Sequence, residues 1–237
     1  MTTRTKLAFI SDRPNASRLS PTLRRSLLTA AVVLIAGVLA PTIPATAGSD
    51  PTAFINNLGN QFQIVARNPA AEQRLAGFRQ LFREDFDVPG LGRFVLGRFV
   101  RVLNPLEQRE FLGLFETYVV YTYSDRLAEF AADGGVTRVI GSRLDAGGTI
   151  VSSVIIGGQT VRPIKVDWRL TERDGVYKIS DVIIDGLSMA VSGRSELEGV
   201  AERNGGQPQA ILVVMRQECA NAALRWITSS PARPLSS

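Results

Sequence analysis

The hydrophobic periodicity of this chain changes once, and this change constrains the fold more than any other feature. Before Asp133-Gly134-Gly135, apolar residues recur at spacings of three and four, which predicts helices. Beyond that point apolar and polar residues alternate, as in "IKVDWRL", where Val166, Trp168 and Leu170 share one face. Gly-rich or charged breaks divide this region into four predicted strands, at about 136–145, 149–157, 162–173 and 176–186. The short connections between them predict antiparallel hairpins.

Helices are predicted on both sides of these strands. One covers 51–67, and Asn68-Pro69 predicts the N-cap and first position of the next. Asn104-Pro105-Leu106-Glu107 has the pattern of a capping box, which predicts a long helix from here to about Phe130. Two more helices are expected near 188–203 and from Pro208 onward. This order predicts an α+β fold, with a small, curved, mainly antiparallel four-stranded sheet covered on one face by several helices.

The start of the chain has the pattern of a secretory signal peptide. Arg24-Arg25 precede a 15-residue apolar run at 26–40, and "ATA" follows, which predicts cleavage after Ala47. The alternative is an uncleaved membrane anchor. The run argues against it, because it is shorter than the roughly 20 residues that a membrane-spanning helix needs. We therefore expect a signal peptide at 1–47, one domain at 48–218 and a partly disordered C-terminal extension at 219–237.

The net charge argues against nucleic acid as a partner. The whole chain has 27 Lys/Arg and 22 Asp/Glu, of which six basic residues and one acid lie in residues 1–47. Residues 48–237 therefore hold 21 of each and are formally neutral. A nucleic-acid-binding domain needs an excess of basic residues to neutralise phosphates, and no such net excess remains.

The residue inventory also removes most catalytic arrangements. The chain contains no histidine and one cysteine, Cys219, so catalytic triads, histidine metal sites and thiolate zinc sites are excluded, and no cofactor motif is visible. Cys219 could cross-link two chains or remain a free thiol in the tail. An enzyme would depend on carboxylates, Lys, Tyr or Ser, and Asp181 and Asp185, four residues apart, are the candidate pair.

Several blocks, taken in order, resemble the MlaC family of periplasmic lipid-binding proteins, also called the toluene-tolerance auxiliary family. The resemblance covers about 54–215 and is strongest at 163–197, in "PIKVDWRL", "GVYKISDV", "DGLSM" and Arg194. "FDV", "LGRFVR" and "EQREFLGLF" match further upstream. Val100 and Ser192-Gly193 depart from the usual Trp and Asn-Tyr, which points to the branch associated with hopanoids.

The resemblance implies a lipid carrier without catalytic activity. Such a carrier takes phospholipid or hopanoid between an outer-membrane lipoprotein complex and an inner-membrane ABC transporter with an MCE-domain subunit. Its acyl chains lie between the sheet and the helices, and its headgroup faces solvent. The resemblance implies that the lining includes Phe94, Phe111, Phe115, Tyr118 and Tyr121 from the helices and Val154, Ile156, Val166, Trp168, Val182 and Ile184 from the sheet.

Under this interpretation the two acids are structural. On a flat strand, Asp181 and Asp185 would share a face with Tyr177, Ile179 and Ile183. We expect them to pair with Arg194 or Arg169, or to cap the junction between sheet and helix near Ser188. Two alternatives remain: an NTF2-like isomerase or dehydratase that uses Asp and Tyr, and a periplasmic interaction module without a ligand.

Overall fold

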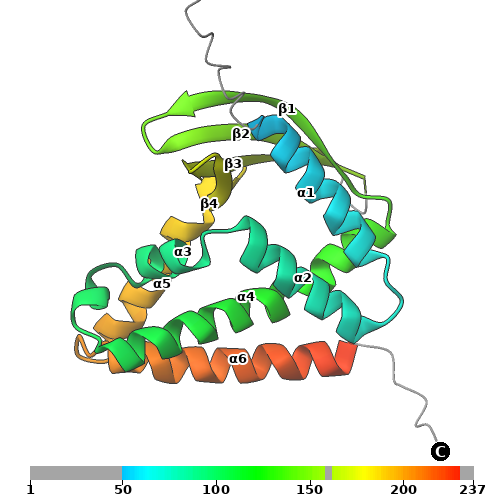
Figure 1. The fold of residues 1–237 in the computed structure, drawn as a ribbon. Coiled ribbons are helices and arrows are strands. Elements are labelled where there is room, and N and C mark those ends of the chain that lie inside the picture. The colour runs from blue at the N-terminus through cyan, green and yellow to red at the C-terminus, as the bar shows by residue number, and fades with distance from the viewer. Residues whose placement is uncertain (1–49, 158–161, 230–237) are drawn as a thin grey trace, which may run out of the picture. The chain divides into compact units, whose positions relative to one another are not determined.

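The computed structural model describes residues 50–157 and 162–229, so the expected signal peptide lies outside the described residues. The helices of the first part are α1 (Pro51–Ala66), α2 (Ala71–Asp85), α3 (Val88–Leu96), the 3-10 helix η1 (Gly97–Arg101) and α4 (Pro105–Ala132). The strands are β1 (Val136–Asp145), β2 (Gly148–Ile156), β3 (Ile164–Arg173), β4 (Val176–Ile184) and β5 (Leu187–Ser188). Helices α5 (Met189–Arg203) and α6 (Gln209–Ser229) follow (Figure 1).

The start of α4 confirms its sequence signal, and the start of α2 does not. The Asn104 side chain accepts hydrogen bonds from the N–H groups of Leu106 and Glu107, while the Glu107 carboxylate accepts one from the N–H of Asn104. The predicted capping box is therefore formed. Ser188 caps α5, where its hydroxyl accepts one hydrogen bond from the N–H of Val191. Asn68 is not the N-cap of α2, because α2 begins at Ala71; its side chain instead accepts from the N–H of Ala70 in the preceding turn.

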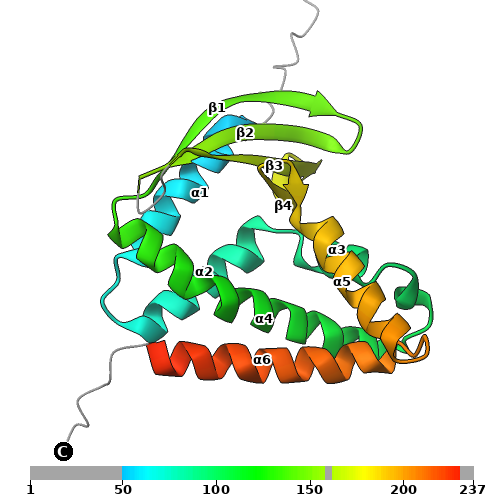
Figure 2. The same cartoon turned by 180° about the vertical axis from the view of Figure 1, so that it is seen from behind.

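The strands form one antiparallel sheet in the order β1-β2-β3-β4-β5, which confirms the predicted α+β class and adds a two-residue fifth strand. Helix α1 lies along one face, where Ile55 and Leu58 pack against Val151, Leu170 and Ile179 (Figures 1 and 2). These five side chains are buried and form the core of this part of the domain.

A bulge in β4 changes which side chains share a face. Leu170 of β3 pairs with Ile179, but its neighbour Arg169 pairs with Asp181, so Ser180 is an extra residue in β4. The bulge rotates the rest of the strand relative to its first part. The prediction that Asp181 shares a face with Ile179 is therefore wrong, because it assumed an unbroken alternation along the strand.

Helix α6 runs parallel to α4 and packs along it. The contacts follow a nearly constant sequence offset: Arg216 pairs with Glu110 at 2.6 Å, the Cys219 thiol donates to the Leu114 carbonyl at 3.1 Å, and the rings of Tyr121 and Trp226 are 5.8 Å apart. Figures 1 and 2 show the two helices side by side. The expected boundary at 218 thus falls inside a continuous helix.

Cys219 does not lie in a tail, as the sequence suggested, but on the buried side of α6. Burial raises the pKa of its thiol. Within residues 50–157 and 162–229, no helix has the length and apolar content that crossing a membrane requires. The apolar run at 26–40 lies outside this part of the chain.

Candidate functional site

The aromatic candidates on α4 occupy different depths in the helical part of the domain. Phe111 is fully buried, at 0% exposure, in a cluster that α3, η1, α4, α5 and α6 form together. Phe115 stacks beside it, with ring centroids 6.1 Å apart, and Tyr118 lies at the edge of the same cluster. Tyr121 packs edge-on against Trp226. Phe111 therefore has the surroundings of an ordinary core residue, while the other three are partly accessible.

The strand register divides the sheet candidates between two faces. Val166 pairs with Ile184, and Trp168 pairs with Val182, so these four side chains lie on the face that α1 covers. Val154 instead pairs with Lys165, and Ile156 pairs with Val136. Residues directly opposite each other in a ladder share a face. A single cavity on the helix-covered face can thus be lined by the first four but not by Val154 and Ile156.

On the helix-covered face, two consecutive hydrogen bonds join a tryptophan, a buried serine and a backbone carbonyl. The Trp168 indole N–H donates to the Ser153 hydroxyl at 2.9 Å, and this hydroxyl donates to the Val166 carbonyl at 3.1 Å. Ser153 is almost completely buried. Because a buried polar group needs a partner, these bonds fix the orientation of the Trp168 ring against the sheet.

Two apolar clusters meet at a bridge of three aromatic residues. One cluster joins the sheet to α1, the other joins α3 to α6, and they have no residue in common. Phe86 packs against the sheet cluster and Phe115 against the helical cluster. Phe82 lies between them, with ring centroids 4.9 Å from Phe86 and 6.4 Å from Phe115. Phe82 is itself buried with Val88 and Val120, so these rings connect the sheet cluster to the helical cluster.

Asp181 and Asp185 do not form a pair. The Asp181 carboxylate accepts from the Ser188 hydroxyl at 2.6 Å and from the N–H of Ala190 at 3.1 Å, at the start of α5. Asp185 lies in the turn after β4 with φ of 47°, and its carboxylate accepts from the N–H of Lys165. Each acid thus has structural neighbours of its own, and the two are not arranged as a general acid and base.

Neither acid forms the expected ion pair with Arg169 or Arg194, because each of these arginines pairs with a different acid. Arg169 pairs with Asp145 at 2.7 Å, and Arg194 pairs with Glu198 at 3.1 Å along α5. In the part of the chain that the structure describes, no three His, Cys, Asp or Glu side chains group closely enough to bind a metal.

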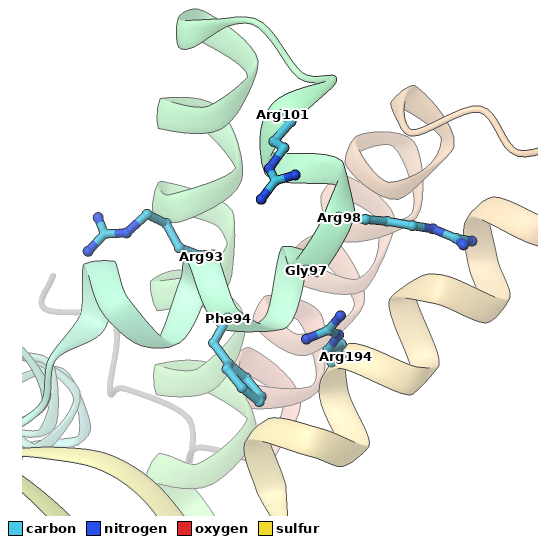
Figure 3. A pocket seen from close by; sticks show the side chains of 6 residues that line it. All are labelled: Arg93, Phe94, Gly97, Arg98, Arg101 and Arg194. Carbon is cyan, nitrogen blue, oxygen red and sulfur yellow. The ribbon is translucent and has the colours of Figure 1, made fainter. Parts of the chain in front are cut away.

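Phe94 lines an open pocket of about 410 Å³ beside α3, η1 and α5. Its ring is 45% exposed. The remaining lining residues are Gly97 and the arginines Arg93, Arg98, Arg101 and Arg194 (Figure 3). The sequence analysis missed this group, although "GRFVLGRFVR" concentrates three of the arginines in ten residues. Only the packing of α5 against α3 adds the fourth, from nearly a hundred residues later.

In this helix-and-sheet domain the two candidate acids hold the ends of neighbouring elements together, Asp181 at the start of α5 and Asp185 at the start of β3. The family model described as "MlaC protein" matches residues 56–217, and the chain belongs to this family.

The fold is similar to a solved structure, that of the phospholipid-binding protein from Ralstonia solanacearum in complex with a phospholipid. The likeness has a TM-score of 0.63 at 18% sequence identity and covers 74% of this chain and 99% of the other. At that identity it shows a shared fold. No curated protein matches this chain in sequence.

Proposed function

We propose that this protein is a lipid carrier that holds the acyl chains of a phospholipid, or of a hopanoid, between its sheet and its helices. One observation carries the proposal: the chain belongs to the MlaC family, and 74% of it has the fold of a protein whose structure was solved in complex with a phospholipid. The structural roles of Asp181 and Asp185 support binding rather than catalysis.

The proposed place for the acyl chains is the aromatic bridge between the two apolar clusters. Phe82, Phe86 and Phe115 hold the clusters together there, and Trp168 and Val182 lie on the sheet side of the same region. Opening the interior at this bridge would separate its rings while the sheet cluster and the helical cluster each keep their own contacts. Phe115, Tyr118, Val166, Trp168, Val182 and Ile184 are the predicted lining residues that remain compatible with one cavity.

The energetics fit exchange between apolar surroundings. Each buried methylene contributes roughly 0.8 kcal/mol, so two acyl chains with about 30 methylenes would cost over 20 kcal/mol to expose to water. The carrier needs only to match the bilayer, because loading transfers the chains from one apolar medium to another. The partners at each membrane would then decide the direction of transfer.

The proposed setting is the periplasm, reached by cleavage of the signal peptide near Ala47. The proposed partners are those that the family resemblance implies: an outer-membrane lipoprotein complex and an inner-membrane ABC transporter with an MCE-domain subunit. These assignments rest on the family and on the pattern of residues 1–47.

Native mass spectrometry of the exported protein, purified without detergent, tests the proposal. We expect an adduct with the mass of a diacyl lipid or a hopanoid, and organic extraction followed by lipid analysis identifies it. A protein that carries no lipid and takes none up from vesicles would rule out the carrier function. Determining the N-terminal residue of the purified chain tests the export signal, and we expect this residue to be Gly48.

A further inference from the structure

The arginine pocket, formed by Arg93, Phe94, Gly97, Arg98, Arg101 and Arg194, has the size of a small-molecule site. Its volume of about 410 Å³ lies toward the lower end of the usual range of roughly 300–1,000 Å³ for ligand pockets. Four of its six lining residues are arginines, so it is unsuited to acyl chains and suited to a compact anion.

The positive charge of this pocket is only partly balanced. Arg98 pairs with Glu202 at 3.3 Å, and Arg194 pairs with Glu198. Among residues 50–157 and 162–229, Arg93 and Arg101 have no ion-pair partner. Of these two, Arg101 extends toward the space beside Gly97 and Arg93 extends away from it, so Arg101 supplies the uncompensated charge there (Figure 3). Guanidinium groups bind phosphate through two parallel N–H···O bonds, which makes phosphate the anion that this group of residues fits best.

Arg194 is held at the pocket by several contacts. Gly97 has φ of 56°, a left-handed conformation that glycine adopts readily, and a Cβ atom built there would lie 2.8 Å from Nε of Arg194. The Arg194 guanidinium carbon also lies 5.6 Å from the centroid of the Phe94 ring, within cation–π range. The bare backbone of Gly97 thus leaves room for the guanidinium, and Phe94 and Glu198 position it.

Exposed apolar side chains adjoin the pocket. Val191 precedes Arg194 by three residues, so both lie on the same side of α5. Val191 is 52% exposed, and Phe94, which lines the pocket, is 45% exposed. Arginines beside exposed apolar residues match a molecule that has both a phosphate and an apolar part, more closely than they match free phosphate.

We propose that the arginine pocket binds the phosphate of the carried lipid's headgroup. This inference rests on the proposed carrier function and names its cargo as a phosphate-bearing lipid. Arg101 and Arg194 extend toward the space beside Gly97 and donate to the phosphate oxygens, whereas Arg93 and Arg98 extend outward in different directions (Figure 3). The headgroup is thus recognised by charge as well as by its attachment to the acyl chains.

The test compares two lipids that share their acyl chains and differ in the phosphate. Vesicles of phosphatidylcholine carry a trace of fluorescent phosphatidic acid or of fluorescent diacylglycerol, and uptake by the purified protein is measured. The variant is Arg101→Gln/Arg194→Gln. Its control is Arg67→Gln/Arg138→Gln. This variant also removes two exposed arginines, one at the end of α1 and one in β1, and both lie outside the pocket.

We expect the unaltered protein and the control variant to take up phosphatidic acid at least tenfold better than diacylglycerol. The pocket variant should lose this preference and retain its uptake of diacylglycerol. High salt should reduce the preference in the unaltered protein, because it screens charge. If the double variant fails to fold, Arg101→Gln alone, at an exposed and unpaired residue, should still lower the preference.

The other outcomes separate the two proposals. Uptake of both lipids without preference, or a preference that survives in the pocket variant, would overturn the headgroup site and leave the carrier function standing. Uptake of neither lipid would overturn the carrier function itself. Calorimetric titration with inorganic phosphate tests whether the pocket binds free phosphate instead of a lipid headgroup. Binding as tight as that of phosphatidic acid would assign the pocket to free phosphate and contradict the proposal.

Discussion

The carboxylate of Asp181 accepts a hydrogen bond of 2.6 Å from the Ser188 hydroxyl, and this contact joins β4 to the first turn of α5. Its second oxygen accepts from the N–H of Ala190, one of the helix N–H groups that has no partner within the helix. The acid is buried, so both interactions occur away from water. Asp181 and Ser188 together fix where the sheet ends and the helix begins.

Replacing this acid should therefore lower stability and spare binding. Asp181→Asn is expected to cost about 1–2 kcal/mol in the free energy of unfolding, because one acceptor of a buried, charge-assisted pair is lost. Asp185→Asn is the control, since asparagine tolerates the left-handed conformation of that turn, and it should cost less. Urea unfolding measures both. A well-folded Asp181→Asn protein of unchanged stability that binds no lipid would contradict the structural role.

Truncating Phe111 and truncating Phe94 should affect stability differently, because Phe111 lies in the core and Phe94 lines the pocket. Phe111 is completely buried, so Phe111→Ala should cost about 3–5 kcal/mol. Phe94 is nearly half exposed, so Phe94→Ala should change stability by about 0.5 kcal/mol or less. Thermal or urea unfolding checks both values. A large loss of stability on truncating Phe94 would mean that its ring belongs to the core.

The two faces of the sheet offer a matched pair of bulky substitutions. Val182 and Val154 are both half-buried, but Val182 lies on the helix-covered face and Val154 on the other. Val182→Trp should block lipid uptake from vesicles at least tenfold, because the indole would fill the proposed acyl site. Val154→Trp should leave uptake within about twofold, since it adds bulk outside that site. The reverse result would place the acyl chains on the opposite face.

Asp85 should make stability depend on pH. Burial raises the pKa of this carboxyl above its ordinary value of 3.8, Lys178 partly opposes the rise, and Glu84 adds to it. One of its oxygens is buried with no hydrogen-bond partner among the described residues. Because the folded state holds the proton more tightly than the unfolded state, the contribution of Asp85 to stability declines as the pH rises from the unfolded pKa through the folded one.

Asp85→Asn removes this titration. Relative to the unaltered protein, its free energy of unfolding should be higher at about pH 7 than at about pH 4. Urea unfolding at both values, with Asp174→Asn in an exposed hairpin as the control for loss of a carboxylate, measures the difference. A stability difference that does not change with pH would show that the Asp85 carboxyl is not affected by its burial.

Local signals in the sequence were sufficient to predict the α+β class of the fold. The period-two alternation of "IKVDWRL" and the capping box at Asn104 both act through neighbours within a few residues, and β3 and α4 formed as predicted. The blocks that resemble the MlaC family were likewise readable from their order along the chain, and the family match confirms that resemblance.

The tertiary structure decided what depends on contacts between distant residues. The extra residue at Ser180 turns Asp181 away from Ile179, and no local pattern marks it. The packing of α6 on α4 buries Cys219, which from sequence looked like part of a tail. The arginine pocket needs α5 to lie against α3, because Arg194 joins Arg101 only through that contact. Periodicity reports which side of an element is apolar; only packing decides which elements that side meets.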